Sequence, residues 1–223
     1  MALPVPTPDL ALSLDNLVER ALALGKRGER IIIGITGSPG AGKTTLAMQV
    51  VEGINSLSEV ARAAYLPMDG FHLANATLDQ LGIRDRKGAI ETFDGWGFVA
   101  LLERILIERD HPVYAPSFER NVDEGIAGEI ALAPAVEIVI AEGNYLLVDH
   151  EPWNRIPELL AESWFCEVEE SERLTRLVDR HTRHGRTPAA ALEWARSVDG
   201  ANALLIERTQ SRADCVIPKM AIT

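Results

Sequence analysis

The 223-residue chain has only two cysteines and no long hydrophobic run, and each shortage excludes a class of protein. Cys166 and Cys215 lie far apart in apolar stretches, so we expect two small core side chains and neither a disulfide nor a metal site. No run approaches the roughly 18 apolar residues that a membrane-spanning helix needs. The N-terminal stretch carries Asp9 and Asp15 and no basic start, unlike a secretory signal. We therefore expect a cytoplasmic protein that does not span a membrane.

Basic residues are also in short supply. The chain has 22 Lys and Arg residues against 33 Asp and Glu residues, which gives a formal net charge of −11 at pH 7. Nucleic-acid binding requires a basic face, so an acidic chain of this kind is a poor candidate for it. Any anion that the protein binds must be held by a local cluster of cations acting against the field of the whole chain.

The length and the 47% hydrophobic content fit a single α/β domain with a substantial core. Five short apolar stretches that alternate with helical patterns predict a parallel sheet sandwiched between helices. Residues 1–13 contain three prolines and are expected to form an arm, whereas residues 110–134 are expected to form a long loop. Residues 70–95 are expected to be irregular, with short helical pieces. The expected strands are 31–36, a stretch ending near 68, 136–142, 163–168 and 213–217, and the expected helices are 15–26, 43–55, 96–108, 171–184 and 188–207.

The stretch GSPGAGKT at residues 37–44 matches the pattern G-x-x-x-x-G-K-[ST] in full. Its glycines allow successive backbone N–H groups to point at phosphate oxygens, and the following helix adds its positive end. The lysine carries a charge to the β- and γ-phosphates, and the threonine hydroxyl suits Mg²⁺. The alternative, a plain glycine-rich turn, does not explain why a strand precedes the loop and a helix follows it. The residues expected to bind a nucleotide here are Gly37, Ser38, Pro39, Gly40, Ala41, Gly42, Lys43, Thr44 and Thr45.

Two acidic residues follow predicted strands. Glu142 ends the strand at 136–142, and ligands of open α/β sheets bind at that edge, so Glu142 is expected to help hold Mg²⁺ together with Thr44. Asp69 follows the strand that ends near residue 68 and could take the proton of an attacking hydroxyl, or contribute to the metal site. The alternatives are an ordinary acid at a strand end and a turn aspartate that caps the next segment. His72 is as well explained by packing as by substrate contact.

Four arginines form a ladder in the predicted helix at 171–184. Their spacing of three, four and three residues places them within about a quarter turn of one helix face. Such a face could bind the charge that develops on a transferred phosphate. The alternative is a solvated face neutralised by nearby glutamates. Gly185 and Pro188 flank a tight turn, which predicts two helices that close as a lid over about 171–207. The arginines are Arg173, Arg176, Arg180 and Arg183, and the glutamates are Glu169, Glu170 and Glu172.

From Ile31 to Pro218, the chain resembles the P-loop kinases of small metabolites, which include uridine kinase, phosphoribulokinase and bacterial pantothenate kinase. Within that group it is most similar to proteins described as fructose transport system kinases. The stretches that carry the resemblance are GITGSPGAGKTT, MDGFHL, RKGAIETFD, PSFERNVDE, IAEGNYLL, RLTRLVDRHTRHG and RADCVIP. The pair MDGFH and EGNYLL is far more specific than the phosphate loop.

The resemblance implies roles for individual residues. Asp69 matches the catalytic base, Glu142 matches the acid that orders Mg²⁺, and Asp94 matches a carboxylate near the acceptor. Asp94 also suits the N-cap of the next helix, and both roles are compatible. Where uridine kinases usually have a tyrosine, this chain has His72. The remaining implied assignments are Lys43, Arg173, Arg176 and Arg180 for catalysis, Arg212 near the adenine, His72 near the acceptor, and Arg120 and His111 in the expected long loop beside the acceptor. Tyr145 is expected to pack in the core, and a place in the lining of the acceptor pocket is the alternative.

The resulting expectation is an ATP-dependent, Mg²⁺-requiring kinase that phosphorylates a hydroxyl of a small metabolite, most simply a sugar such as fructose. Uridine or another nucleoside and pantothenate are alternative acceptors. A nucleotide-binding regulator without transfer activity is an alternative of a different class. The chain has no N-K-x-D motif of a GTPase switch and no L-S-G-G-Q motif of a transporter ATPase. A homodimer is left open.

Overall fold

The computed structural model describes residues 13–25 and 29–218 of the chain. The expected arm at 1–13 therefore lies outside the described residues, apart from Ser13. The hydroxyl of Ser13 caps α1 (Leu14–Leu24) by accepting a hydrogen bond from the backbone of Asn16 at 3.2 Å. Within the described ranges, no helix combines the length and the apolar character that a membrane crossing requires.

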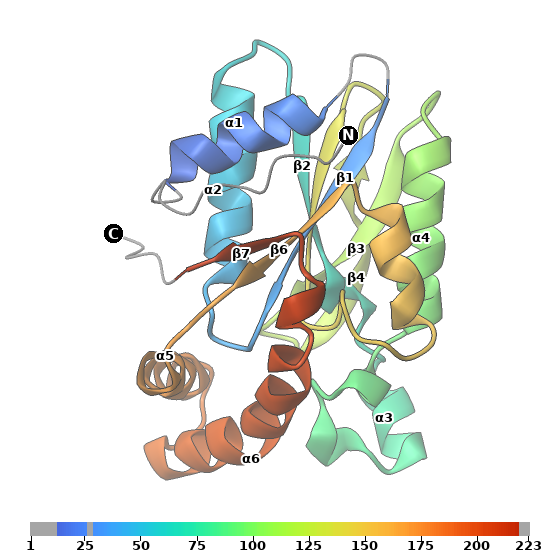
Figure 1. Cartoon of the computed structure of the whole chain (residues 1–223). Coiled ribbons are helices and arrows are strands. Elements are labelled where there is room, and N and C mark those ends of the chain that lie inside the picture. Colours follow the sequence, from blue (N-terminus) through green and yellow to red (C-terminus); the bar gives the residue numbers. More distant parts are fainter. Residues whose placement is uncertain (1–12, 26–28, 219–223) are drawn as a thin grey trace.

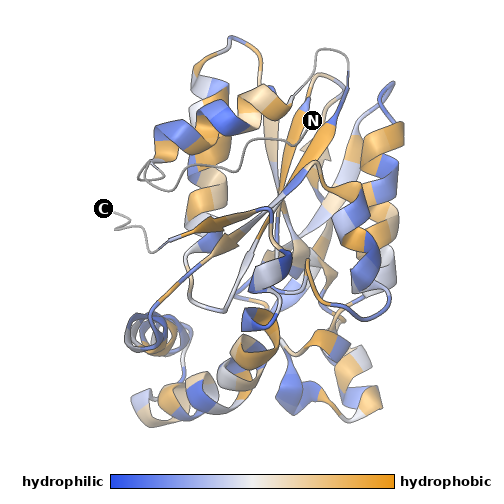
Figure 2. Cartoon of the chain, in the orientation of Figure 1, coloured by the Kyte–Doolittle hydropathy of each residue, from blue (hydrophilic) through white to orange (hydrophobic). Residues whose placement is uncertain are grey.

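The centre of the molecule is the expected parallel sheet of five strands, in the order β2-β5-β1-β6-β7. β1 lies in the middle, and nearly all of its residues are buried because helices cover both faces of the sheet. Figure 2 shows hydrophobic stretches in the central strands and in α4, which packs beside them. The strands are β1 (Ile31–Gly37), β2 (Ala63–Pro67), β5 (Ile138–Glu142), β6 (Glu162–Cys166) and β7 (Cys215–Ile217).

Two hydrophobic clusters fill the space between the sheet and its helices. On one face, α1 and α2 (Lys43–Ser56) pack against β1, with Leu46 and Val50 among the buried residues. On the other face, α4 (Gly95–Ile107) and the 3₁₀ segment η4 (Trp153–Leu159) contribute Phe98, Leu102 and Trp153. Figure 1 shows this three-layer arrangement, which fixes the position of the loop between β1 and α2.

The predicted strand boundaries differ from the observed ones by two residues at three places, and by at most one residue elsewhere. β5 begins at Ile138 and not at 136, because the backbone N–H of Val136 turns back to the carbonyl of Ala133. β6 ends at Cys166, two residues earlier than predicted. β7 begins two residues later than predicted, because the Asp214 carboxylate accepts hydrogen bonds from the backbone and hydroxyl of Ser163.

The helical elements outside the layers gather at the edge where the parallel strands end (Figure 1). The region at 70–95 consists of short helical pieces, as predicted, and the two helices of the predicted lid are present. Thr187 caps the second of these helices by accepting a hydrogen bond from Ala190, and Pro188 is its first residue. The elements are η1 (Met68–Phe71), α3 (Asn75–Leu81), η2 (Arg84–Arg86), η3 (Ile90–Thr92), α5 (Glu170–Arg183), α6 (Pro188–Glu207) and η5 (Gln210–Arg212).

The expectation of a long loop at 110–134 is wrong. This region forms an antiparallel hairpin of β3 (Val113–Glu119) and β4 (Glu124–Leu132). Its register shifts between Ala115 and Ser117, around Pro116, which has no N–H group to donate to a neighbouring strand. Few of its side chains are buried, so the hairpin lacks the clean alternation of polar and apolar residues by which a strand is predicted.

Both cysteines are free, as predicted. Cys166 is buried beside the loop that follows β1, and this burial raises the pKa of its thiol to about 12. The thiol is therefore protonated at neutral pH and behaves as a small apolar side chain.

Arg30 is buried and connects the end of α4 to the turn before β5. Its guanidinium donates hydrogen bonds to the carbonyls of Val136 at 2.8 Å, Ala133 at 2.9 Å, Ile105 at 3.1 Å and Glu108 at 3.2 Å. The planar guanidinium can reach several carbonyls at once, which a lysine ammonium in the same place could not do.

We expect Arg30→Met to lower the free energy of unfolding by about 3 kcal/mol, because the substitution leaves buried carbonyl groups without donors. The measurement is equilibrium unfolding in urea. Arg62→Met is the control, since Arg62 pairs with Glu137 at 2.6 Å in a partly exposed position and should cost less than about 1 kcal/mol. Equal losses for the two variants would contradict the structural role of Arg30.

Candidate active site

The loop between β1 and α2 has the conformation that its sequence predicts. Gly40 and Gly42 have φ values of 85° and 88°, in the left-handed region that side chains with a Cβ rarely adopt. Gly37 is also constrained, because a Cβ there would lie 2.5 Å from the carbonyl oxygen of Cys166. The loop therefore curls tightly at the N-terminal end of α2, where backbone N–H groups can receive an anion.

Lys43 and Glu142 are two buried charges directly beside this loop. The ammonium of Lys43 is 4.0 Å from a Glu142 carboxylate oxygen and donates a hydrogen bond to the Ser38 carbonyl at 3.1 Å. Only 6% of Lys43 and 7% of Glu142 is exposed. Burial lowers the pKa of Lys43, although Glu142 counteracts this, and burial raises the pKa of Glu142, although Lys43 counteracts that. Both groups are therefore poorly solvated and would gain from a bound polyphosphate and a cation.

Two hydroxyl groups orient the Glu142 carboxylate. Thr44 donates a hydrogen bond to it at 3.1 Å, and Tyr65 donates another at 2.9 Å. Burial and the nearby Glu142 raise the pKa of Tyr65, so its hydroxyl remains a donor. Sequence reasoning missed Tyr65, although the parallel pairing of β2 with β5 places it near the end of the strand that carries Glu142.

The residues present fit a magnesium ion that is held partly by phosphate. Thr44 and Glu142 offer a hydroxyl and a carboxylate that already touch each other. In the described part of the chain, no three His, Cys, Asp or Glu side chains cluster as a metal cage would require. Mg²⁺ usually takes only one or two protein carboxylates and completes its octahedron with phosphate oxygens and water.

Asp69 lies on η1, directly after β2, and borders the same cleft as Lys43. The nearest cation to its carboxylate is Arg120, at 3.7 Å, on the tip of the β3–β4 hairpin. The hairpin presses closely on η1, because a Cβ on Gly70 would lie 2.3 Å from the Pro116 carbonyl oxygen. The segment that was predicted as a loop thus positions both Asp69 and Arg120.

The cleft that contains these groups has a volume of about 800 Å³. That is large enough for a nucleotide together with a small second molecule. Its walls come from the phosphate loop, η1, the hairpin, the 82–93 segment and the helices α5 and α6. Cleft residues that sequence reasoning did not assign include Arg84, Lys87, Gly88, Phe93, Phe118, Asp123, Asn144, Leu177, His181, His184, Arg186, Trp194, Asp199 and Asn202.

The arginines of α5 do not all face the cleft. Arg176, Arg180 and Arg183 line it, whereas Arg173 does not. Arg173 is buried, pairs with Glu170 at 2.7 Å and packs against Gly40. Its predicted catalytic role remains a prediction, and its visible contacts fix α5 against the phosphate loop.

Acidic side chains neutralise some of the four arginines of α5, as the alternative interpretation of this helix face predicted. Arg176 pairs with Glu172 at 2.5 Å and donates to the Gly40 carbonyl at 3.3 Å, and Arg183 pairs with Asp179. Arg180 forms no ion pair with any carboxylate of residues 13–25 and 29–218. Its guanidinium faces the cleft, where burial lowers its pKa, so it is the cation of α5 that an incoming anion would stabilise most.

His72 borders the cleft between two aromatic rings. The ring centroids of Phe93 and Phe118 lie 4.0 and 4.6 Å from that of His72. Its Nδ1 lies 2.8 Å from the Asp69 carbonyl oxygen, which can only accept a hydrogen bond, so Nδ1 carries the proton. Burial lowers the pKa of His72, despite the opposing effect of Asp69. Both packing and a place beside the acceptor are therefore consistent with the structure.

Four residues that were predicted near the adenine or the acceptor do not line this cleft. Asp94 caps α4 by accepting a hydrogen bond from Gly97 at 2.8 Å. The buried Tyr145 donates to the Gly88 carbonyl at 2.6 Å. Arg212 pairs with Asp149 at 3.4 Å, and His111 pairs with Asp110 and Glu108. Their contacts are structural, and the functions implied by resemblance remain predictions.

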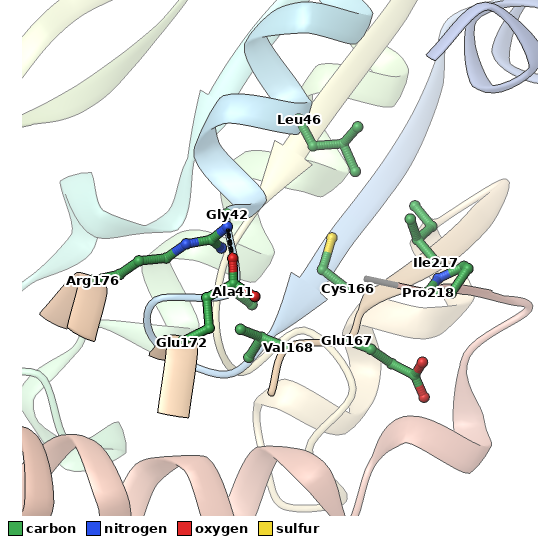
Figure 3. A pocket seen from close by; sticks show the side chains of 10 residues that line it. All are labelled: Ala41, Gly42, Leu46, Cys166, Glu167, Val168, Glu172, Arg176, Ile217 and Pro218. Atoms are coloured by element: carbon green, nitrogen blue, oxygen red, sulfur yellow. Dashed lines mark hydrogen bonds and ion pairs between the residues drawn. The ribbon is translucent and has the colours of Figure 1, made fainter. Parts of the chain in front are cut away.

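A second, much smaller cavity lies on the other side of the phosphate loop (Figure 3). Its volume is about 20 Å³, enough for one water molecule. In Figure 3, Arg176 and Glu172 lie beside Ala41 and Gly42 on one side, and Ile217 and Pro218 lie on the other. Arg176 and Gly42 border both this cavity and the cleft, and so lie between them.

Comparison with known proteins agrees with this geometry. A model of the "Phosphoribulokinase / Uridine kinase family" matches residues 32–223. The chain is 32% identical to a Schizosaccharomyces pombe protein named "Putative uridine kinase C227.14", over 100% of this chain and 97% of that protein. It is 32% identical to a pantothenate kinase of Enterococcus faecalis over 50% of this chain and 36% of that protein.

A solved structure gives the same fold over nearly the whole length. It is a "putative fructose transport system kinase" from Silicibacter sp. TM1040, which is 35% identical and has a TM-score of 0.84. The match covers 92% of this chain and 98% of that one.

We expect Tyr65→Phe to raise the Mg²⁺ concentration needed for half-maximal activity by about tenfold, because the buried Glu142 carboxylate loses one of its two hydroxyl donors. The measurement is a magnesium titration at fixed ATP. Tyr114→Phe is the control, since Tyr114 is exposed on the hairpin. If both variants require the same magnesium concentration as the wild type, Tyr65 does not support the metal site.

Proposed function

The chain belongs to the phosphoribulokinase/uridine kinase family and is a kinase, and from this premise we propose that it transfers the γ-phosphate of ATP to a sugar hydroxyl. The observation that carries the proposal is the meeting of Lys43, Thr44, Glu142 and Asp69 in one cleft. Fructose is the first candidate, because the related Silicibacter protein is described as a fructose transport system kinase.

Each polar group of the cleft has a task in this reaction. Bound magnesium–ATP supplies the phosphoryl group. Lys43 and the N–H groups of the phosphate loop would hold its phosphates, while Thr44 and Glu142 would hold the metal. Asp69 takes the proton of the attacking hydroxyl as that oxygen bonds to the γ-phosphorus and ADP leaves.

The lid supplies positive charge and excludes water. Arg180 has no carboxylate partner within the described residues, so it can neutralise charge on the transferred phosphate without first breaking an ion pair. Closure of α5 and α6 over the cleft would exclude water, whose attack on ATP is the competing reaction. Arg176, next to the small cavity, would contact the adenine ring of ATP. Because the cavity has a volume of only about 20 Å³, the ring would not enter it and would lie across its mouth.

Two other acceptors have specific support. The S. pombe relative is named for uridine and the E. faecalis relative for pantothenate. A regulator that binds nucleotide without transferring phosphate is disfavoured by the position of Asp69, which such a protein does not need. We expect the enzyme to work in the cytoplasm, where ATP is abundant.

The experiment is a coupled assay of ADP release with magnesium–ATP and D-fructose, uridine or D-pantothenate, followed by mass spectrometry of the product. We expect one sugar or sugar-containing acceptor to give a phosphorylated product. Nucleotide binding without phosphorylation of any acceptor would instead favour the regulator.

On a true acceptor, we expect Asp69→Asn to lower kcat by about a thousandfold while the affinity for ATP changes little, because only the proton acceptor is lost. The measurement is steady-state kinetics with both substrates varied. Asp85→Asn is the control, since Asp85 is an exposed aspartate outside the cleft. Full turnover by Asp69→Asn would contradict its role as the base.

A further inference from the structure

Asn202 lies on α6 and faces the cleft, although only 7% of it is exposed. Its side-chain nitrogen donates a hydrogen bond to the Gly88 carbonyl oxygen at 3.1 Å. A carbonyl oxygen can only accept, so this contact fixes which way the amide points. The side-chain oxygen Oδ1 must therefore point away from Gly88.

Both lone pairs of the Gly88 carbonyl oxygen are engaged in hydrogen bonds. It accepts a second hydrogen bond from the Tyr145 hydroxyl at 2.6 Å, which occupies its other lone pair. Asn202 Oδ1, in contrast, has no hydrogen-bond partner among the described residues, and it is not completely shielded from solvent. Oδ1 is thus an oriented acceptor that is open to the cleft.

The surroundings of Asn202 favour a ligand group that donates hydrogen bonds. Asp199 lies three residues earlier on the same helix and also borders the cleft, with one carboxylate oxygen 2.7 Å from His181 Nε2. The nearby Lys87 is already engaged, since its ammonium donates to Asn75 and Asp123. This wall therefore presents acceptor oxygens, and its lysine is not available to hold an anionic substituent.

We propose that Asn202 is a specificity residue whose Oδ1 accepts a hydrogen bond from a second hydroxyl of the acceptor, one that is not phosphorylated. The acceptor is then a polyol, and an analogue that lacks this hydroxyl leaves Oδ1 unpaired. The proposal rests on the proposed function, which it deepens by naming the chemistry that selects the second substrate.

Tyr145 provides a matched control, because it makes the same anchoring contact with Gly88 but is buried outside the cleft lining. If Asn202 only anchors the Gly88 segment, Asn202→Ala and Tyr145→Phe should have the same effect. If Asn202 contacts the substrate, only Asn202→Ala should change the discrimination between hydroxyl analogues. Asn202→Leu, of similar volume, takes its place if the alanine variant does not fold.

The experiment measures calorimetric binding of D-fructose, uridine and their monodeoxy analogues to the full chain, in the presence of Mg²⁺ and a non-hydrolysable ATP analogue. We expect the wild type to prefer one parent compound over one deoxy analogue by about tenfold. Asn202→Ala should lose this preference, and Tyr145→Phe should keep it.

Three results would overturn the proposal: equal preference in the wild type and Asn202→Ala, loss of preference in both variants, or no binding of any of these polyols. Binding with the expected preferences but without phosphorylation under ATP would support the role of Asn202 and contradict the proposed function. The two failures are therefore distinguishable.

Discussion

Lys43 and Glu142 lie 4.0 Å apart, almost without access to water, beside the phosphate loop at the N-terminal end of α2. Neither charge is well satisfied, because burial lowers the pKa of Lys43 and raises that of Glu142. A triphosphate with its magnesium ion would give each charge a further partner. The rest of the site is arranged around this pair, with Thr44 and Tyr65 fixing the carboxylate and α2 beginning at the lysine.

The sheet topology brings the remaining groups to the same edge. Because all five strands are parallel, the loop after β1, Asp69 after β2 and Glu142 at the end of β5 emerge on one side. The helices α5 and α6 and the β3–β4 hairpin then border that side from different directions. The hairpin holds Arg120 near Asp69, and α5 carries Arg180 into the cleft without an acidic partner among the described residues. Family membership sets the reaction class, whereas the cleft walls must set the acceptor.

The sequence was sufficient for the central layer and the phosphate loop, because buried parallel strands read as apolar runs and the loop needs glycine at defined places. It was not sufficient for the hairpin, whose exposed strands and bulge at Pro116 give no periodic signal. Arginine spacing predicted the ladder but not that Arg173 turns inward to Glu170. Asn202 and Tyr65 could not be found, because their roles depend on contacts with residues 114 and 77 positions away along the chain.

The central claim is that the phosphate loop and Lys43 bind the tail of a nucleotide, and calorimetry with magnesium–ATP tests it most directly. The account predicts measurable heat and a single site for the wild type, and a loss of affinity of at least about a hundredfold for a folded Lys43→Ala variant. Absence of heat with the well-folded wild type, or equal affinity in the two proteins, would contradict it.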